Sequence, residues 1–396
     1  MVEGRHLPQK GTTDYVLLLI VAILLFIGLM MIFSATFTLG ARPTYFLERQ
    51  ALWIFLGLIA LVITARLDYQ IWRQWAVPIL AVTLLVLLGL LFLGRGSEGA
   101  RRWITGKSGQ PSEFCKLTVI MYVAAWLASK GTKIRQVTYG LVPFAILVGF
   151  VAALIILQPA RSTAVLIAFV AGIMFFVAGA DTVQVMASLV IGLATTYLVV
   201  RGSDYATSRV ETFLNPMSDP LGEGYQIRGV LTALASGGLT GRGLGESVQK
   251  LFPPQVYHSD AIIAIIGEEL GLIGCLVVIG LFLCFAYRGL YIALKAKDTF
   301  ATLLAVGITS WITCQAFIHL AANTATLPYT GVTLPFVSYG GSSVVSCLAG
   351  VGVLLSVGRG TPLRKSNSAS FNYRRRNRGP RLSGTVRRQG SRHRTQ

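Results

Sequence analysis

Charged residues are scarce in this 396-residue chain, where Asp, Glu, Lys and Arg together make up 13% of the sequence. A soluble domain carries roughly a quarter charged residues. The mean hydropathy is +0.65, and 54% of the residues are hydrophobic. Recurring apolar runs of about 18 or more residues are typical of helices that cross a bilayer. The composition therefore excludes a water-soluble globular protein and predicts an all-α, polytopic membrane protein.

Cysteine is also rare, and nucleotide-binding signatures are absent. The five cysteines lie in apolar segments without metal-type spacing, so we interpret them as packing residues and expect no protein metal site. The glycine-rich run 237–245 has neither the Gly-Lys-Ser/Thr ending of a Walker loop nor a preceding strand. This run is better suited to a flexible loop that lets the backbone approach a ligand.

Acidic residues are missing from residues 361–396, which contribute 11 of the 19 net positive charges. This segment is rich in Arg, Ser and Gly and too poor in apolar residues to fold alone, so we predict a disordered cytoplasmic tail. Basic residues near a membrane are attracted to anionic headgroups by about 1 kcal/mol each, which makes anionic lipids the expected partner. A protein partner is the alternative, and nucleic acid is not expected.

Ten apolar runs predict ten membrane-spanning helices within residues 14–360. Residues 1–13 are predicted to be a cytoplasmic segment, because the first run is too long for a signal peptide and lacks a cleavage site. Residues 201–259 form the one long connection and are predicted to be a large extracytoplasmic loop. The runs cover residues 14–37, 48–65, 74–94, 112–130, 138–157, 162–179, 182–200, 260–288, 299–323 and 342–358.

The short loops predict the orientation, because basic residues accumulate on the cytoplasmic side of a membrane. With ten spans, most basic loop residues fall on one side, together with the tail, so both termini are expected in the cytoplasm. The loop 324–341, on the opposite side, has no charged residue. The basic residues on the predicted cytoplasmic side are Arg5, Lys10, Arg66, Arg73, Lys130, Lys133, Arg135, Arg288, Lys295 and Lys297.

Two predicted outer loops also carry cations, which indicates an anionic substrate at the level of the outer headgroups. For any single residue, an ordinary solvated loop charge is an equal alternative. The cations are Arg95, Arg101, Arg102 and Lys107 in the third loop and Arg209, Arg228, Arg242 and Lys250 in the long loop.

Three carboxylates enter or lie within the apolar run that begins at residue 260. An acidic group near the bilayer centre costs about 2.5–3.5 kcal/mol, so it normally faces a cavity or a partner. Helical spacing predicts that Asp260 and Glu268 share one face and that Glu269 points away from it. Asp260, at the outer mouth, is a candidate general base. The simpler alternative is that Ser259 or Asp260 caps the helix.

Two other segments have two interpretations each. Glu113 and Lys116 stand at i and i+3 at the start of a span, where they could pair with each other or Lys116 could reach a phosphate in a cavity. Residues 334–343 combine a proline, a glycine pair and hydroxyl groups. They suit a re-entrant segment lining a cavity, with a plain loop as the alternative.

These segments, in this order, resemble the SEDS family of bacterial membrane proteins (shape, elongation, division and sporulation). The resemblance covers about residues 14–360. The residues at 247–250 and the long basic tail are most similar to those of the division-type member. The matching segments are Gly99–Ile104, Gln110–Phe114 with Lys116, Phe213–Pro216, Asp219–Pro220, Gly222–Gln226, Gly243–Lys250, His258–Asp260, Gly267–Gly271 and Leu334–Ser343.

The resemblance implies a peptidoglycan glycosyltransferase that polymerises lipid II, an undecaprenyl-pyrophosphate-linked precursor, on the outer face of the cytoplasmic membrane. Asp260 matches the essential loop aspartate of the family, and Lys116 and Arg102 match further required positions. Glu268 and Glu269 are expected to be structural or to line the cavity. The residues expected to bind substrate are Arg101, Arg102, Glu113, Lys116, Arg242, Gln249, Lys250, His258 and Ser338.

The family also implies a monofunctional class B penicillin-binding transpeptidase as partner, together with other divisome membrane proteins at the septum. No cofactor is assigned, although a divalent cation could bridge the pyrophosphate. The alternative functions are a lipid II flippase or transporter, an elongation-type polymerase and a non-catalytic scaffold for a transpeptidase. A flippase should carry charged residues reaching the midplane from both sides, whereas most candidates here cluster outward.

Two stretches depart from the family pattern and put the hydrogen bonding of the expected site in doubt. Where the family usually has Gln-Pro-Asp, this chain has Gln158-Pro159-Ala160. Where the family has Leu-Pro-Glu-Ala, this chain has Pro254-Gln255-Val256-Tyr257. Both changes leave Asp260 in place.

Overall fold

The structure, a computed structural model, describes residues 13–37, 44–93, 110–158, 160–215, 223–248 and 259–360. These residues belong to one structural unit, Met1–Leu363, and contain helices but no strand. The predicted basic tail and most of the predicted N-terminal segment lie outside them.

Ten of the helices coincide with the ten predicted spans, with ends that differ by at most six residues. The helices in chain order are α1 (Tyr15–Thr36), α2 (Tyr45–Arg66), α3 (Tyr69–Leu93), α4 (Pro111–Lys130), the 3-10 helix η2 (Gly131–Arg135), α5 (Leu141–Leu157), α6 (Arg161–Val177), α7 (Thr182–Arg201), α8 (Asp204–Leu214), α9 (Glu223–Gly237), α11 (Ile262–Leu294), α12 (Thr299–Asn323) and α13 (Gly341–Gly360).

Seven of these helices are long and apolar enough to cross a membrane: α1, α2, α3, α7, α11, α12 and α13. Helices α5 and α6 are equally apolar but have only 17 residues each. Helix α4 has 20 residues, and the charged Glu113 and Lys116 near its start lower its hydropathy. The predicted polytopic, all-α membrane fold is confirmed.

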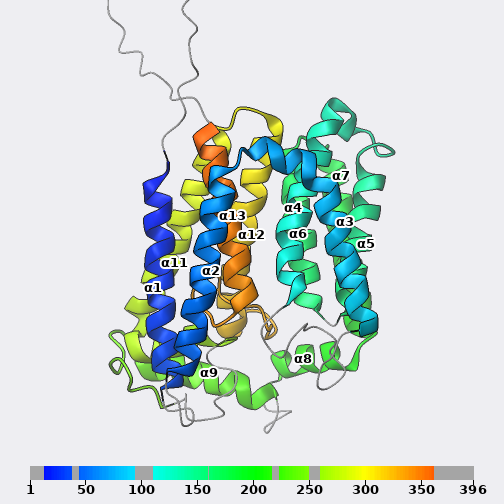
Figure 1. The fold of residues 1–396 in the computed structure, drawn as a ribbon. Coiled ribbons are helices and arrows are strands. Elements are labelled where there is room, and N and C mark those ends of the chain that lie inside the picture. The colour runs from blue at the N-terminus through cyan, green and yellow to red at the C-terminus, as the bar shows by residue number, and fades with distance from the viewer. Residues whose placement is uncertain are drawn as a thin grey trace, which may run out of the picture. The chain divides into compact units, whose positions relative to one another are not determined.

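The long connection between the seventh and eighth predicted spans contains two helices that the sequence analysis did not predict. Helices α8 and α9 lie across one end of the bundle, near the segment 324–340 (Figure 1). We call this end the loop end. The basic turns that follow α2, α4 and α11 lie at the opposite end, which we call the basic end.

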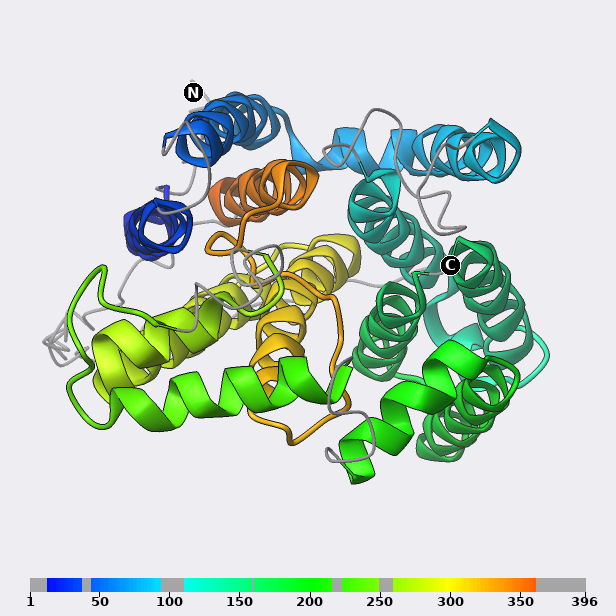
Figure 2. The same ribbon diagram turned by 90° about the horizontal axis from the view of Figure 1, so that it is seen from below.

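Helices α12 and α13 form the centre of the bundle, with 67% and 89% of their most apolar stretch buried, against 6% for α7. Seen from the loop end, α13 lies beside α2, and α1 lies beside α2 and α11 (Figure 2). Helix α12 contacts α4 and α6, and so joins this group to the helices α3 to α7. A polar side chain on the inner side of α12 is therefore enclosed by protein and has no contact with lipid.

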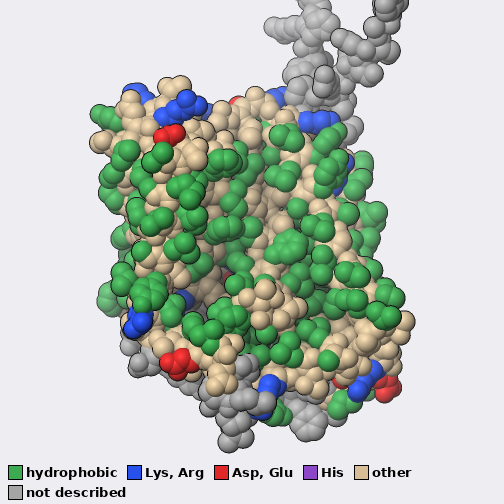
Figure 3. All heavy atoms as spheres, turned by 180° about the vertical axis from the view of Figure 1, so that it is seen from behind, with side chains coloured by type: hydrophobic (Ala, Val, Ile, Leu, Met, Phe, Trp, Pro, Cys, Tyr) green, Lys and Arg blue, Asp and Glu red, His purple; other side chains and the backbone are tan. Residues whose placement is uncertain are grey.

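The outer surface of the bundle is apolar at mid-height. Figure 3 shows one broad face on which hydrophobic side chains cover the middle, while Lys and Arg lie near the two ends. Val190, Leu193 and Leu198 of α7 are among the exposed apolar residues. Since lipid tails are as apolar as these side chains, this surface suits a bilayer.

Helix α11 is kinked at Gly271, whose backbone has φ 69° and ψ −165°. This region of φ is unfavourable for residues with a Cβ. A Cβ at Gly271 would lie 2.3 Å from the backbone nitrogen of Gly241. The kink thus lets residues 238–248, which follow α9, pack directly on the backbone of α11.

Candidate active site

A buried ammonium group lies near the loop end, at the start of α4. The helix begins with Pro111 at its first position, and Lys116 Nζ is 2.8 Å from Glu113 Oε2 one turn earlier. Lys116 is 2% exposed and is the one buried Lys or Arg in the part of the chain that the structure describes. The structure shows the ion pair of the first interpretation, and binding of a phosphate by Lys116 stays a prediction.

Helix α12 completes the surroundings of this ammonium. Lys116 Nζ donates to Gln315 Oε1 at 2.7 Å, and the same oxygen accepts from Trp311 Nε1 at 2.8 Å. The ammonium also lies 5.5 Å from the centre of the Trp311 ring. A buried charge is tolerated only when it is paired and hydrogen-bonded, and this arrangement supplies both conditions.

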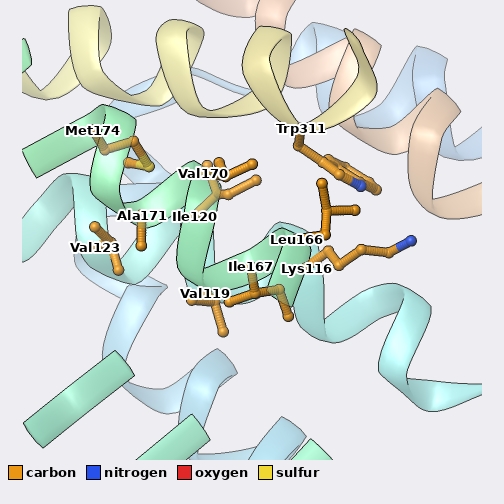
Figure 4. Close-up of a pocket in the computed structure, with 10 residues that line it drawn as sticks. All are labelled: Lys116, Val119, Ile120, Val123, Leu166, Ile167, Val170, Ala171, Met174 and Trp311. Carbon is orange, nitrogen blue, oxygen red and sulfur yellow. The ribbon is translucent and has the colours of Figure 1, made fainter. Parts of the chain in front are cut away.

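An apolar cleft extends from Lys116 between α4, α6 and α12. It is small, with a cavity volume of about 10 Å³, and its walls include Ile120, Ile167 and Met174. In Figure 4 the stem of Lys116 lies at one end of the cleft, and its ammonium points away from the apolar residues.

Asp260 lies in a turn just before α11 and is partly exposed. The N-cap position of the helix is Ala261, so neither Ser259 nor Asp260 occupies it, as the simpler alternative had expected. Because Asp260 precedes the helix, the helical spacing that placed it on one face with Glu268 does not apply, and that prediction is wrong.

The surroundings of Asp260 come from α12 and from the segment after it. Asn323 Nδ2, at the last residue of α12, donates to the backbone oxygen of Asp260 at 3.1 Å. A Cβ on Gly331 would lie 3.4 Å from Asp260 Oδ2. The carboxylate therefore lies against the backbone of residue 331.

The segment 329–333 connects the surroundings of Asp260 with those of Lys116. Gln315, which binds the Lys116 ammonium, donates to the backbone oxygen of Thr333 at 3.0 Å. At the other end of the segment, Arg209 Nη1 of α8 donates to the backbone oxygen of Tyr329 at 3.1 Å. The described structure thus links a partly exposed acid and a buried cation through one short stretch of backbone.

Glu268 binds residues 238–248 to α11. Its carboxylate accepts from Ser247 Oγ at 2.6 Å and from the backbone nitrogen of Val248 at 3.1 Å. Arg242, expected to bind substrate, lies with Nη1 3.7 Å from Glu268 Oε1, and its side chain is 44% exposed. In the described structure Arg242 is therefore part of the attachment of this loop.

Glu269 faces a different element, α1, where Ser34 Oγ donates to both carboxylate oxygens at 2.6 and 2.7 Å. The two neighbouring acids thus point to different partners. Both are 1% exposed. Each joins α11 to another part of the chain.

The tip of the segment 334–338 enters the bundle. The backbone of Phe336 and Val337 packs on Gly28, whose Cβ would lie 2.7 Å from Phe336 O. Gly28 is about 12 Å from the loop end of α1 at 1.5 Å per residue, so the tip reaches well below the helix ends. This inward course is the re-entrant arrangement that the sequence analysis proposed as one interpretation.

Ser338 closes this tip. It is 1% exposed, and its Oγ accepts from the backbone nitrogen of Leu334 at 2.9 Å. Its backbone oxygen accepts from Gln50 Nε2 of α2 at 3.4 Å. In the described structure the Ser338 hydroxyl therefore shapes the loop, and binding of substrate by this group stays a prediction. Next to it, burial raises the pKa of Tyr339, while Arg49 acts in the opposite direction.

Several expected site residues lie outside the described residues, and their roles stay predictions. They are Arg101, Arg102, Gln249, Lys250 and His258. Within the described ranges, no three His, Cys, Asp or Glu side chains come together as metal ligands.

Three buried polar residues of α12 were not predicted from the sequence: Gln315, His319 and Asn323. They are at most 1% exposed and are four residues apart, so they lie along one face of the helix. Polar residues at this spacing inside an apolar run were the signal that could have revealed them.

The fold and this site define a polytopic α-helical membrane protein with a polar site near one end of the bundle. A family model described as "Cell cycle protein" (FTSW_RODA_SPOVE) matches residues 15–362. The chain belongs to this family, which confirms the predicted SEDS membership.

Curated relatives and solved structures agree. "Probable peptidoglycan glycosyltransferase FtsW" of Trichlorobacter lovleyi is 40% identical, over 92% of this chain and 98% of the relative. "Stage V sporulation protein E" of Bacillus subtilis is 39% identical, over 89% of this chain and 98% of the relative.

Among solved structures, the rod shape determining protein RodA of Thermus thermophilus has a TM-score of 0.67 at 27% identity, covering 88% of this chain and 97% of that chain. A chain from a structure described as "Structural coordination of polymerization and crosslinking by a peptidoglycan synthase complex" has a TM-score of 0.72 at 28% identity. The match covers 88% of this chain and 98% of the chain in the solved structure.

Proposed function

We propose that this chain is a peptidoglycan glycosyltransferase that polymerises lipid II into glycan strands for septal wall synthesis. The names of the relatives support this activity, and their similarity extends over nearly the whole chain. The observation that carries the proposal is the link, through residues 329–333, between the partly exposed Asp260 and the buried Lys116.

In the proposed reaction, a sugar hydroxyl of the acceptor attacks the anomeric carbon of the donor, and the bond from that carbon to the pyrophosphate breaks. Asp260 takes the proton of the attacking hydroxyl. The leaving pyrophosphate takes the bonding electrons, and cations in a water-poor site stabilise the added charge. Lys116 is one such cation, and Arg101, Arg102, Arg242 and Lys250 are the other candidates.

A polyprenyl chain needs an apolar path beside the polar site, and in this proposal it stays in lipid or in a groove between helices, because the apolar cleft between α4, α6 and α12 has a volume of only about 10 Å³. Its walls are apolar over most of their length, and Lys116 lies at one end. A divalent cation bridging the pyrophosphate would belong to the substrate complex.

We further propose that the loop end faces outward and that both termini are cytoplasmic. The basic turns at the opposite end support this orientation, since basic residues concentrate on the cytoplasmic side. By this proposal the chain works at the septum with a class B penicillin-binding transpeptidase and other divisome membrane proteins. The tail then lies at the anionic lipids of the inner leaflet.

The test is polymerisation of purified lipid II by the full chain with its transpeptidase partner, followed by gel analysis of the strands. Asp260→Asn keeps the size of the side chain and should abolish polymerisation while the protein stays folded. Wild-type polymerisation by Asp260→Asn would overturn the base assignment. Movement of lipid II across vesicles by a wild-type protein that forms no strands would establish a flippase instead.

A further inference from the structure

The last turns of α12 carry three polar side chains that the reaction scheme does not use. Gln315, His319 and Asn323 follow one another at four-residue spacing, and they are 0%, 0% and 1% exposed. Burying a polar group in an apolar helix is costly unless it is hydrogen-bonded. We call these residues the α12 polar row.

Each member of the row binds backbone or side chain next to the candidate site. Gln315 joins the Lys116 ammonium, at 2.7 Å, to the backbone oxygen of Thr333, at 3.0 Å. His319 Nδ1 lies 2.7 Å from the backbone oxygen of Val332. Asn323 Nδ2 donates to the backbone oxygen of Asp260 at 3.1 Å.

The row therefore binds the backbone of Asp260 and the backbone that lies next to its carboxylate. Asn323 holds the backbone that carries the acid, and His319 holds the residue after Gly331, which lies against Oδ2. Asn323 Nδ2 also donates to the backbone oxygen of His319 at 2.9 Å, which ties the two members together. A rigid helix with three such attachments can fix the position of the acid relative to the cation.

We propose that the α12 polar row positions Asp260 and Lys116 for glycosyl transfer, and that His319 and Asn323 are positioning residues for the general base. The inference rests on the proposed function, because it assigns these residues a part in that reaction. It goes further in naming a central helix, distant from Asp260 in sequence, as the element that sets the geometry of the site.

The chemistry of His319 suggests a sharp test. A backbone oxygen can only accept, so Nδ1 carries the proton and Nε2 is a bare acceptor. Nε2 has no partner in the described structure. In His319→Asn the amide nitrogen takes the place of Nδ1 and can keep the bond to Val332. In His319→Gln the amide reaches only the place of Nε2, and the bond is lost.

The experiment measures kcat and KM for lipid II with the full chain and its transpeptidase partner. We expect His319→Gln and Asn323→Leu to lower kcat about ten- to a hundredfold, with KM within about twofold, because a small displacement of a catalytic group has effects of this size. His319→Asn should restore most of the rate. Thr309→Val is the matched control, since it removes a buried hydroxyl of the same helix that has no partner in the described structure.

The outcomes separate the inference from the proposed function. If Asp260→Asn is inactive but folded His319→Gln keeps the wild-type kcat, the inference is wrong and the proposed function stands. A folded His319→Asn that is as slow as His319→Gln, or slower, would also overturn it, because Nδ1 would then not be the group that matters. Wild-type strand formation by Asp260→Asn would instead overturn the base assignment on which the inference rests, and failure of the wild-type chain to form strands would contradict the proposed function itself.

Discussion

Asn323 Nδ2 donates to the backbone oxygen of Asp260 at 3.1 Å, so the last residue of α12 holds the turn that precedes α11. This bond joins residues that are 63 positions apart in the sequence. It brings the candidate base to the end of the helix whose Gln315 also binds the Lys116 ammonium. The central helix of the bundle is thus the common support of the acid and the cation.

Removing one partner of the ion pair between Lys116 and Glu113 should lower the stability of the protein more than removing both partners. Lys116→Met leaves the buried Glu113 carboxylate without its cation and should lower the free energy of unfolding by about 3–5 kcal/mol. Adding Glu113→Gln should recover part of this loss, because no buried charge then remains. Denaturant unfolding of the two single variants and the double variant measures the coupling, and strictly additive losses would contradict it.

The kink of α11 should depend on the absence of a side chain at Gly271. Gly271→Ala forces a Cβ into a backbone conformation with φ 69° and to within 2.3 Å of the Gly241 nitrogen. We expect a marked loss of thermal stability and detachment of residues 238–248, which limited proteolysis would detect. Gly280→Ala in the same helix is the control, since its Cβ would meet no described atom within 4 Å and alanine favours helix by up to about 1 kcal/mol. Equal melting temperatures for the two variants would refute this account.

The attachment of the loop after α9 to α11 should depend more on Ser247 than on Arg242. Ser247→Ala removes a 2.6 Å hydrogen bond to the buried Glu268 carboxylate and should cost about 1.5–3 kcal/mol. Arg242→Ala should cost at most about 1 kcal/mol, because its side chain is 44% exposed and its pair distance is 3.7 Å. Thermal unfolding in detergent ranks the two variants, and a larger loss for Arg242→Ala would reverse the assignment.

The sequence predicts the features of this fold that depend on local patterns. Apolar runs gave all ten bundle helices, and the spacing of Glu113 and Lys116 gave their ion pair as one of two interpretations. Helices α8 and α9 were missed, because the connection that contains them is polar and rich in Gly and Pro and so read as a loop.

The surroundings of the candidate site could not be predicted in this way, because they depend on contacts between distant segments. No periodicity relates Asp260 to Asn323 or to Gly331. Helical spacing predicted that Asp260 shares a face with Glu268, which is wrong because the helix begins only after Asp260. The α12 polar row could be recognised in the sequence by its four-residue spacing, but the residues to which it hydrogen-bonds could not.

Gly331 should leave room at the Asp260 carboxylate that a side chain would occupy. A Cβ at this position would lie 3.4 Å from Oδ2, which is an ordinary van der Waals contact, so Gly331→Ala should fold with little change in melting temperature. The methyl group would nevertheless cover the carboxylate oxygen against which the acceptor hydroxyl must lie. We therefore expect kcat for lipid II polymerisation to fall about tenfold, and further in Gly331→Val, since catalysis requires the reacting atoms about 3–3.5 Å apart. Gly340→Ala is the control in the same connection, because its Cβ would contact only side chains of Ser343 and Thr333. Wild-type kcat in Gly331→Val would show that this side of Asp260 does not face the reacting sugar.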